Sequence, residues 1–465
     1  MNTKHLRSTK VINSTILESI ALWLIILVIT TSYGFQYRTL EASVPYYFIT
    51  ASFIFLLFIA SLAALILQPK IVITSPKILI KIQLRHLAIT LMLANLLMGI
   101  YFYSGSAYLP TKSMMILATL VATVLSIAQR YKEALWALAG IGICLFIYLS
   151  LNTPLDVEAA NMLPIIGAGC DSLLNGENPF LHTYPEIASS PLYYLPLHIL
   201  PYCPLQSLEL DLRWLNVAIF ILLIILLIRT FDFINNPEIL GLTFFPLLSS
   251  PMMLQAGYYG HLWIYWLGLV IMANLLWRGK LWLVAVIVGL LLLTRQTYIF
   301  IVGLLGASLI SALGWKNCMK YGALSLSIVI TGFVSIYLLT HVHPFEFYSA
   351  IKSASEVTHK ITNNPMDQIS LSGLFVFFKM RPILMEMQLL MASVLGVIFI
   401  LFLKSRPVSI ILMLIGIGYV LIISMSVYIH RYFYAPGFIL IAYGLALQLK
   451  EQRIHSIFDD IVSAQ

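Results

Sequence analysis

The chain has 465 residues, of which 60% are hydrophobic and 10% are charged, and its mean hydropathy is +0.93. Charged residues make up about 25% of soluble domains, so this composition excludes an ordinary soluble globular protein. A net charge of +8 would suit nucleic acid, but the basic residues lie in short loops between apolar runs, where they set membrane topology, and we expect no nucleic-acid partner.

Apolar runs of about 20 residues recur along the chain, and each is long enough to cross a bilayer as a helix. We therefore predict an all-α fold, a multi-pass transmembrane helical bundle of about 14 spans with short interfacial helices in the outer loops. The spans are expected at 12–33, 46–67, 86–103, 113–128, 134–151, 212–229, 239–254, 261–277, 281–294, 298–314, 321–340, 384–403, 407–428 and 432–449.

The distribution of Lys and Arg orients these spans. With the N-terminus in the cytoplasm, 18 of the 27 basic residues fall inside and 9 fall outside, as the positive-inside rule requires. Two long segments, 152–211 and 341–381, then lie outside. We divide the chain into an accessory module of four spans (1–133), a region from 134 to 449 that includes both outer loops, and a cytoplasmic tail (450–465).

The segment 152–211 holds 7 of the 19 acidic residues, and long irregular segments of this kind are often functional. Near its start the segment has TPLD at 153–156, which predicts the N-terminus of a helix. Asp156 would then lie at the positive end of that helix. Asp156 is either a reactive carboxylate or part of that cap. Glu158 is two residues away, so on a helix the two carboxylates cannot point at one atom, but in a non-helical entry they could share a divalent cation.

Further along this segment, Pro164 limits the first helical piece, and LLNG at 173–176 predicts the end of a second piece with Gly176 as its C-terminal stop. Cys170 and Cys203 both fall in the segment. They form a disulfide if it faces an oxidising compartment, and otherwise they are two buried thiols.

Several short motifs follow the fifth span in a recognisable order. They are LDVE at 155–158, LLNGENPF at 173–180, YP at 184–185, SPLYYLP at 190–196, GYYGH at 257–261, RGK at 278–280, TRQ at 294–296 and HRYFYAP at 430–436. Together they resemble the GT-C glycosyltransferases, most closely the branch that uses polyprenyl-phosphate mannose, over residues 134–449. The chain differs from that branch in its four preceding spans, in His261 where the family has Gln, and in Arg295-Gln296 where it has Lys-Pro.

The resemblance implies an inverting glycosyltransferase, mannosyltransferase-like, that moves a sugar from a polyprenyl-phosphate donor to a hydroxyl of a lipid or glycan acceptor. It implies that Asp156 is the general base, which contributes about 10²–10⁴-fold to the rate. It also implies an integral protein of a bacterial plasma membrane, surrounded by membrane lipids, with its site facing the periplasm or exterior. A divalent cation held by Asp156 and Glu158 is permitted but not required, and no other metal or cofactor is expected.

The donor phosphate needs cationic groups, and Arg295 and Arg431 each lie at the outer end of a span, where phosphate headgroups lie. They are either phosphate ligands or interfacial anchors. Further candidates for binding substrate or donor phosphate are Glu158, Gln296, His261 and Tyr184. Tyr184 and its aromatic neighbours suit sugar stacking and equally suit an interfacial aromatic belt.

Four histidines are further candidates for binding residues, and two other functions are alternatives to the transferase. His182 and His198 either bind the acceptor or phosphate or are structural, and His341 with His343 either ligates a metal or is a hydrogen-bonded loop pair. A polytopic lipid or solute transporter, or flippase, would need acids or bases inside its spans, which are scarce here. A polysaccharide polymerase or ligase is normally centred on a large outer loop later in the chain.

Overall fold

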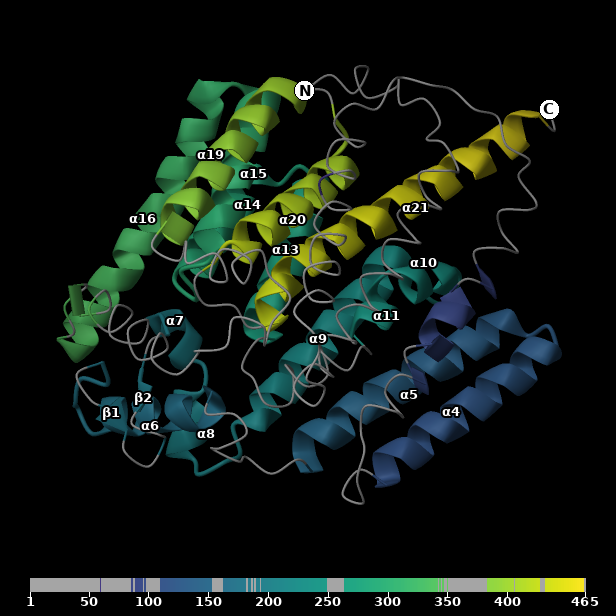
Figure 1. Cartoon of the computed structure of the whole chain (residues 1–465), viewed down its shortest axis with the longest axis horizontal. Coiled ribbons are helices and arrows are strands. Elements are labelled where there is room, and N and C mark those ends of the chain that lie inside the picture. Colours follow the sequence, from purple (N-terminus) through teal and green to yellow (C-terminus); the bar gives the residue numbers. More distant parts are fainter. Residues whose placement is uncertain are drawn as a thin grey trace.

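The structure is a computed structural model of the whole chain (Figure 1). It describes residues 59, 85–86, 88–94, 96–97, 109–152, 162–180, 183–184, 187, 190–192, 194–248, 263–341, 343, 345–346, 349, 383–404, 406–426 and 431–463. Except for one pair of two-residue strands, the regular structure of these residues is helical.

Many of the predicted spans overlap helices among the described residues, but some bounds differ, as in the last helix, which continues to Ser463. In chain order the elements are α4 (Leu109–Ile127), α5 (Tyr131–Asn152), α6 (Met162–Leu174), β1 (Thr183–Tyr184), β2 (Ser190–Pro191), α7 (Pro196–Ile199), α8 (Cys203–Ser207), α9 (Arg213–Phe231), α10 (Pro237–Leu242), α11 (Phe244–Leu248), α13 (Trp263–Trp277), α14 (Leu281–Leu292), α15 (Tyr298–Leu313), α16 (Trp315–Thr340), α19 (Leu384–Phe402), α20 (Val408–Ser424), the 3-10 helix η6 (Arg431–Tyr434) and α21 (Ala435–Ser463). Strands β1 and β2 pair antiparallel, with Thr183 opposite Pro191. The predicted span 12–33 lies outside the described residues, and so does 46–67 except for Ile59.

Five of these helices, α4, α5, α9, α16 and α19, are long and apolar enough to cross a membrane. Large apolar side chains are exposed along one side of α4, among them Leu117, Leu120, Val124 and Ile127, and similar side chains are exposed on α16 and α19. Contiguous exposed apolar surfaces of this kind are rare on soluble monomers. These helices are therefore compatible with a helical membrane protein.

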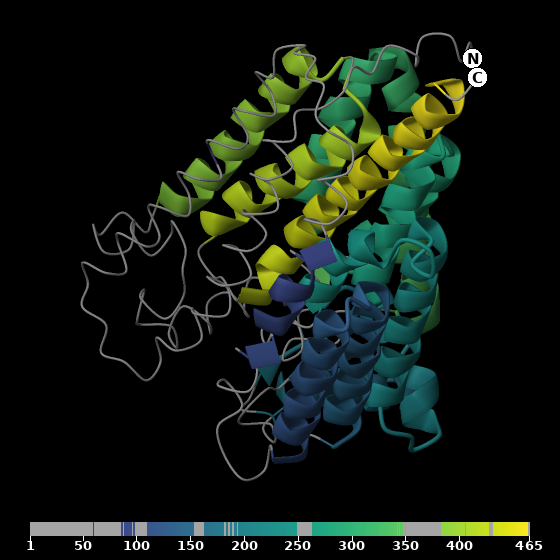
Figure 2. The ribbon, with the colours of Figure 1, turned by 90° about the vertical axis from the view of Figure 1, so that its right-hand side faces the viewer.

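Helices α20 and α21 form the most closely packed pair, and they run side by side in both views (Figure 1, Figure 2). Glycines allow this approach: a Cβ added at Gly437 would lie 2.7 Å from the carbonyl oxygen of Gly416 on the facing helix. Almost every described residue of α20 is buried, so this helix lies at the centre of the main apolar core.

The predicted span 239–254 begins as two short helices rather than one. Helices α10 and α11 are separated at Thr243, and every residue from Pro237 to Leu248 is buried. Pro246 explains the break, because it has no N–H to bond the carbonyl of Leu242 and its ring crowds that carbonyl. The hydroxyl of Thr243 donates to the carbonyl of Ile239 at 2.8 Å, which satisfies one of the interrupted helix's backbone groups.

Contacts between distant helices agree with the predicted alternation of the spans. The ammonium group of Lys450 on α21 donates to the carbonyl of Thr230 at the end of α9 at 2.6 Å and lies 4.7 Å from the ring of Trp277 at the end of α13. These three positions were all predicted near the inner face. We call this the predicted inner end of the bundle, and the opposite end, where α9, α15 and α21 begin, the predicted outer end.

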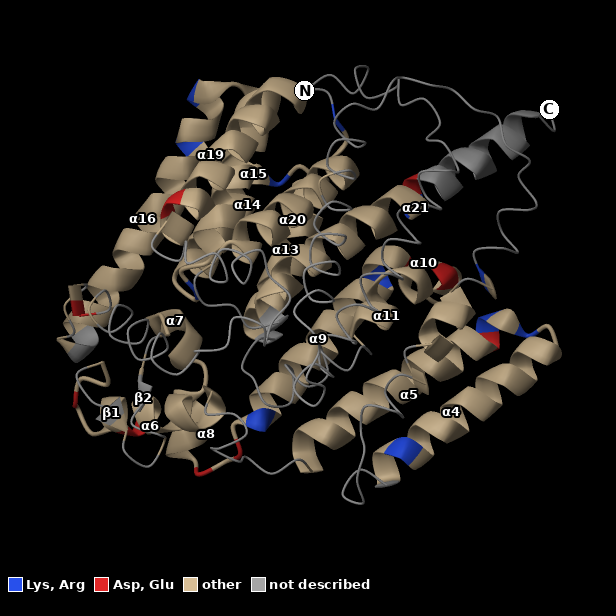
Figure 3. Cartoon of the chain, in the orientation of Figure 1, with Lys and Arg blue, Asp and Glu red and all other residues tan. Residues whose placement is uncertain are grey.

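The described residues between 162 and 211, called the 162–211 unit, form a small unit at the predicted outer end, with its own apolar core around Ile166, Leu192 and Tyr202. Side chains from the last third of α16, such as Ile336, close that core. Helix α6 ends at Leu174, and Gly176 adopts a positive φ of 74°, as predicted for a glycine stop. The acidic residues of the unit are visible at the lower left of Figure 3.

A disulfide between Cys170 of α6 and Cys203 of α8 ties this unit together, with 5.0 Å between the two Cα atoms. Of the two sequence-based alternatives, the structure has the bonded pair. The bond closes a loop of 33 residues, and the chain-entropy model gives such a loop about 3–4 kcal/mol of stabilisation.

We expect the Cys170→Ser/Cys203→Ser double variant to unfold at a clearly lower temperature than the wild type, measured by thermal unfolding in detergent. Cys144→Ser is the matched control, because Cys144 is a free, exposed cysteine. Unfolding of the double variant at the same temperature as the control would show that the bond is absent or unimportant.

Candidate functional site

The short turn between α14 and α15 carries Arg295. Residues Thr294 to Thr297 are polar, whereas the sequences on both sides are apolar, as expected for a turn between two apolar helices. The hydroxyl of Thr294 donates to the carbonyl of Leu291 at 2.6 Å and helps to end α14. The turn lies at the predicted outer end, as the sequence indicated.

Arg295 is buried, with 8% of its surface exposed. Its Nη1 donates to the hydroxyl of Tyr265 on α13 at 2.9 Å, and its guanidinium lies 4.3 Å from the ring centre of Phe433 in η6. A buried guanidinium loses its hydration, and contacts with aromatic faces and with a hydroxyl help to offset that loss. A buried arginine between two apolar helices is therefore a candidate functional residue.

Other aromatic side chains surround this guanidinium. The ring of Tyr298, in the first turn of α15, meets the ring of Tyr265 edge to face at 5.6 Å. The positive charge of Arg295 also acts on the hydroxyls of Tyr298 and of Tyr419 on α20. We call the following six residues the Arg295 cluster: His198, Tyr265, Arg295, Tyr298, Tyr419 and Phe433.

The 162–211 unit contributes His198 to this cluster. The backbone N–H of Leu197 in α7 donates to the carbonyl of Leu293 at 3.2 Å, which fixes α7 directly on the turn that carries Arg295. The imidazole of His198 stacks on Tyr194 at 4.8 Å and contacts Tyr265 at 5.3 Å. The position of α7 is therefore set by backbone pairing as well as by packing.

Burial, and secondly the charge of Arg295, hold the pKa of His198 well below its ordinary value of 6.5. The imidazole is fully buried and neutral at pH 7. Within the cluster the charge at neutral pH is therefore the single positive charge of Arg295.

This low pKa predicts a pH dependence of stability. As the pH falls below about 6.5, the unfolded state binds a proton at His198 that the folded state does not, so stability falls. We expect this residue to lower the unfolding temperature at pH 5.5 relative to pH 7.5. His198→Gln should remove that part of the pH dependence, whereas His343→Gln, at an exposed histidine, should not. An unchanged pH profile in His198→Gln would contradict the assignment.

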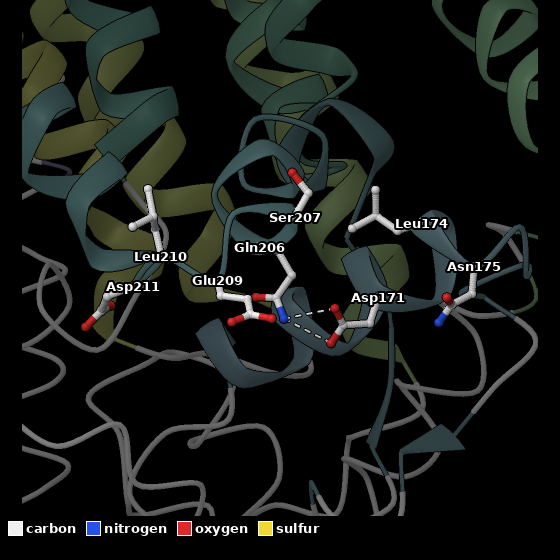
Figure 4. A pocket seen from close by; sticks show the side chains of 8 residues that line it. All are labelled: Asp171, Leu174, Asn175, Gln206, Ser207, Glu209, Leu210 and Asp211. Atoms are coloured by element: carbon white, nitrogen blue, oxygen red, sulfur yellow. Dashed lines mark hydrogen bonds between the residues drawn. The ribbon is translucent and has the colours of Figure 1, made fainter.

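A polar pocket of about 680 Å³ lies on the 162–211 unit (Figure 4). Three carboxylates line it, those of Asp171, Glu209 and Asp211. Two of the three are already occupied: the amide of Gln206 donates to both oxygens of Asp171 at 2.9 Å, and Arg213 forms an ion pair with Asp211. The described residues that line the pocket offer hydrogen-bond acceptors but include no Lys or Arg, so this lining is unsuited to phosphate.

The predicted site residues fall into three groups. Asp156, Glu158, His261 and His182 lie outside the described residues. Arg295 lies in the cluster, Gln296 is exposed beside it in the same turn, and Arg431 begins η6, the short helix that brings Phe433 onto Arg295. Tyr184 is buried in the 162–211 unit, where its hydroxyl donates to the carbonyl of Pro179 at 3.1 Å.

A hydrogen bond joins the two predicted outer loops. Asn178, from the LLNGENPF motif, accepts the N–H of Phe180 at 3.0 Å and donates its amide to the carboxylate of Glu346, 168 residues away. Glu346 also accepts the N–H of His343 at 3.1 Å, so this acid is engaged by hydrogen bonds. Among the described residues, no group of three or more His, Cys, Asp or Glu side chains could hold a metal ion.

The sequence did not single out Tyr265, Tyr298, Tyr419 or Phe433 as site residues. One signal was present: a tyrosine in an apolar span needs a partner for its hydroxyl, and three tyrosines stand within the spans that meet at Arg295. Which of the chain's 25 tyrosines converge depends on helix packing, which the sequence pattern does not give.

Comparison of the chain with family models, with curated proteins and with solved structures found no match.

Proposed function

We propose that the chain is an integral membrane glycosyltransferase of the GT-C type. It transfers a mannose-like or related hexose from a polyprenyl-phosphate donor to a hydroxyl acceptor, with inversion at the sugar carbon. In this reaction the acceptor hydroxyl loses its proton to Asp156 as its oxygen bonds the sugar C1. The bond from C1 to the phosphate oxygen breaks, and the polyprenyl phosphate leaves with its negative charge beside Arg295.

One observation carries the proposal: separate stretches of the predicted motif set converge on Arg295. Arg295 of TRQ directly contacts Phe433 of HRYFYAP and Tyr265, which follows GYYGH by four residues. Tyr194 of SPLYYLP is linked to them through His198, which contacts Tyr265. These stretches are up to about 240 residues apart in the chain, so no local preference brings them together. Binding of one common ligand by these stretches would explain why they lie together.

The electrostatics of the cluster support a phosphate ligand. Arginine presents a planar fork of donors that matches phosphate oxygens, and in a low-dielectric site such a group stabilises developing negative charge strongly. His198 is neutral and Tyr265 supplies a hydroxyl, so the described cluster holds one positive charge without a competing carboxylate among its members.

The test is direct transfer. Wild-type protein in proteoliposomes is given radiolabelled polyprenyl-phosphate hexoses and membrane extracts as acceptor source, and we expect labelled product of inverted anomeric configuration. Absence of transfer from every such donor would reject the proposal.

A lipid or solute transporter is the second candidate, favoured by the broken and fully buried helix pair α10–α11. Interrupted helices mark substrate sites in many transporters. The same proteoliposomes separate the two candidates: movement of labelled lipid across the bilayer without covalent transfer would favour transport.

A further inference from the structure

The hydroxyl of Tyr298 is buried in the Arg295 cluster. The residue is fully buried, and its hydroxyl oxygen has no hydrogen-bond partner among the residues that the structure describes. Buried hydroxyls nearly always have a partner, because leaving one unsatisfied is costly. An orphan hydroxyl of this kind therefore calls for a specific explanation.

The position of Tyr298 in the fold suggests an explanation for its unpartnered hydroxyl. It follows Arg295 by three residues, at the start of the helix that continues from the Arg295 turn. Its ring packs edge to face on Tyr265, whose hydroxyl accepts the hydrogen bond from Arg295. The orphan hydroxyl and the buried guanidinium thus belong to one constellation.

We propose that Tyr298 is a second phosphate-binding residue, whose hydroxyl donates to a non-bridging oxygen of the same phosphate that Arg295 binds. This inference rests on the proposed function and adds to it. A guanidinium fixes a phosphate by charge and by its fork of donors, and a rigid buried hydroxyl fixes its orientation. Tyr298 is therefore a binding residue that positions the leaving group.

A purely structural tyrosine makes the opposite prediction. If the hydroxyl has no ligand, Tyr298→Phe removes an unsatisfied polar group, so stability stays equal or rises and ligand binding does not change. If the hydroxyl binds phosphate, the ligand-free protein behaves in the same way but loses affinity for the phosphorylated lipid. The variant keeps the ring, so its packing on Tyr265 is retained.

Tyr443→Phe is the matched control. Tyr443 is also fully buried, and its ring packs on Phe231 at 5.2 Å. It lies eight residues along α21 from Ala435, which is about 12 Å at 1.5 Å per residue. It is therefore removed from the Arg295 cluster.

The experiment measures thermal stabilisation of purified protein by a polyprenyl phosphate without a sugar, with unphosphorylated polyprenol as the lipid control, and measures sugar transfer in parallel. We expect wild type and Tyr443→Phe to be stabilised by the phosphorylated lipid only. We expect Tyr298→Phe to need about 10- to 100-fold more of it, the loss of one hydrogen bond to a charged group, and to show a raised KM for the donor.

Unchanged lipid affinity and KM in Tyr298→Phe, while the wild type transfers sugar, would overturn the role of Tyr298 and leave the proposed function standing. Phosphate-dependent stabilisation that Tyr298→Phe weakens, without transfer by the wild type, would support the phosphate site and reject the transferase. Equal stabilisation of the wild type by polyprenol and by polyprenyl phosphate would reject a phosphate site altogether.

Discussion

Replacing Arg295 with glutamine is expected to lower the rate of sugar transfer by about 10²–10³-fold, the usual cost of removing one preorganised group that stabilises developing charge. Glutamine keeps hydrogen-bonding capacity toward the hydroxyl of Tyr265 but removes the positive charge. Because His198 is neutral, no other member of the cluster replaces that charge. The measurement is transfer from a radiolabelled polyprenyl-phosphate hexose in proteoliposomes.

Two variants make this result interpretable. Arg213→Gln is the matched control, since Arg213 also lies at the predicted outer end but is paired with Asp211, and it should leave transfer near the wild-type level. Arg295→Lys keeps the charge but not the planar fork, so we expect intermediate activity. Wild-type activity in Arg295→Gln, in protein that folds normally, would remove Arg295 from the mechanism.

Replacing Asp156 with asparagine is expected to reduce transfer by about 10²–10⁴-fold, the contribution of a positioned general base. Asp156 lies outside the described residues, so this prediction rests on the motif order of the sequence. Asparagine has nearly the same shape and can still cap a helix, so a merely structural Asp156 would tolerate the change. The measurement is the same transfer assay, at saturating donor and acceptor.

Glu158→Gln provides the comparison for Asp156→Asn. If one carboxylate acts alone, Glu158→Gln should retain most activity, whereas similar losses in both variants together with inhibition by chelators would indicate a shared divalent cation. Full activity in Asp156→Asn would rule out Asp156 as the base.

Within the described residues, the sequence predicted many of the helix positions, because long apolar runs favour helices, which satisfy their own backbone hydrogen bonds. The runs 298–314 and 384–403, for example, became α15 and α19 with bounds differing by at most one residue. The run 239–254 was expected as one helix because its hydropathy is continuous, but Pro246 interrupts the backbone bonding within it. Hydropathy measures the free energy of transferring side chains into lipid, so it does not reveal where a proline interrupts the helical hydrogen bonds.

The site could be predicted only in part. Arg295 was found because a charged residue beside a span is conspicuous, and its burial confirms that it faces the protein. Tyr298 was not found, since a tyrosine within an apolar run is not a conspicuous signal. Its interpretation depends on the lack of a hydrogen-bond partner among the described residues, which only the folded structure reveals. The disulfide between Cys170 and Cys203 was one of two open alternatives, because spacing alone does not fix the distance between two cysteines.

The most direct measurement is a cryo-EM structure of the wild-type protein with a phosphonate analogue of the polyprenyl-phosphate sugar, which binds but is not transferred. We predict density for the phosphonate within hydrogen-bonding distance of the Arg295 guanidinium and the Tyr298 hydroxyl. Density for that group only at the predicted inner end, beside Lys450 and Trp277, would contradict the assignment of the site.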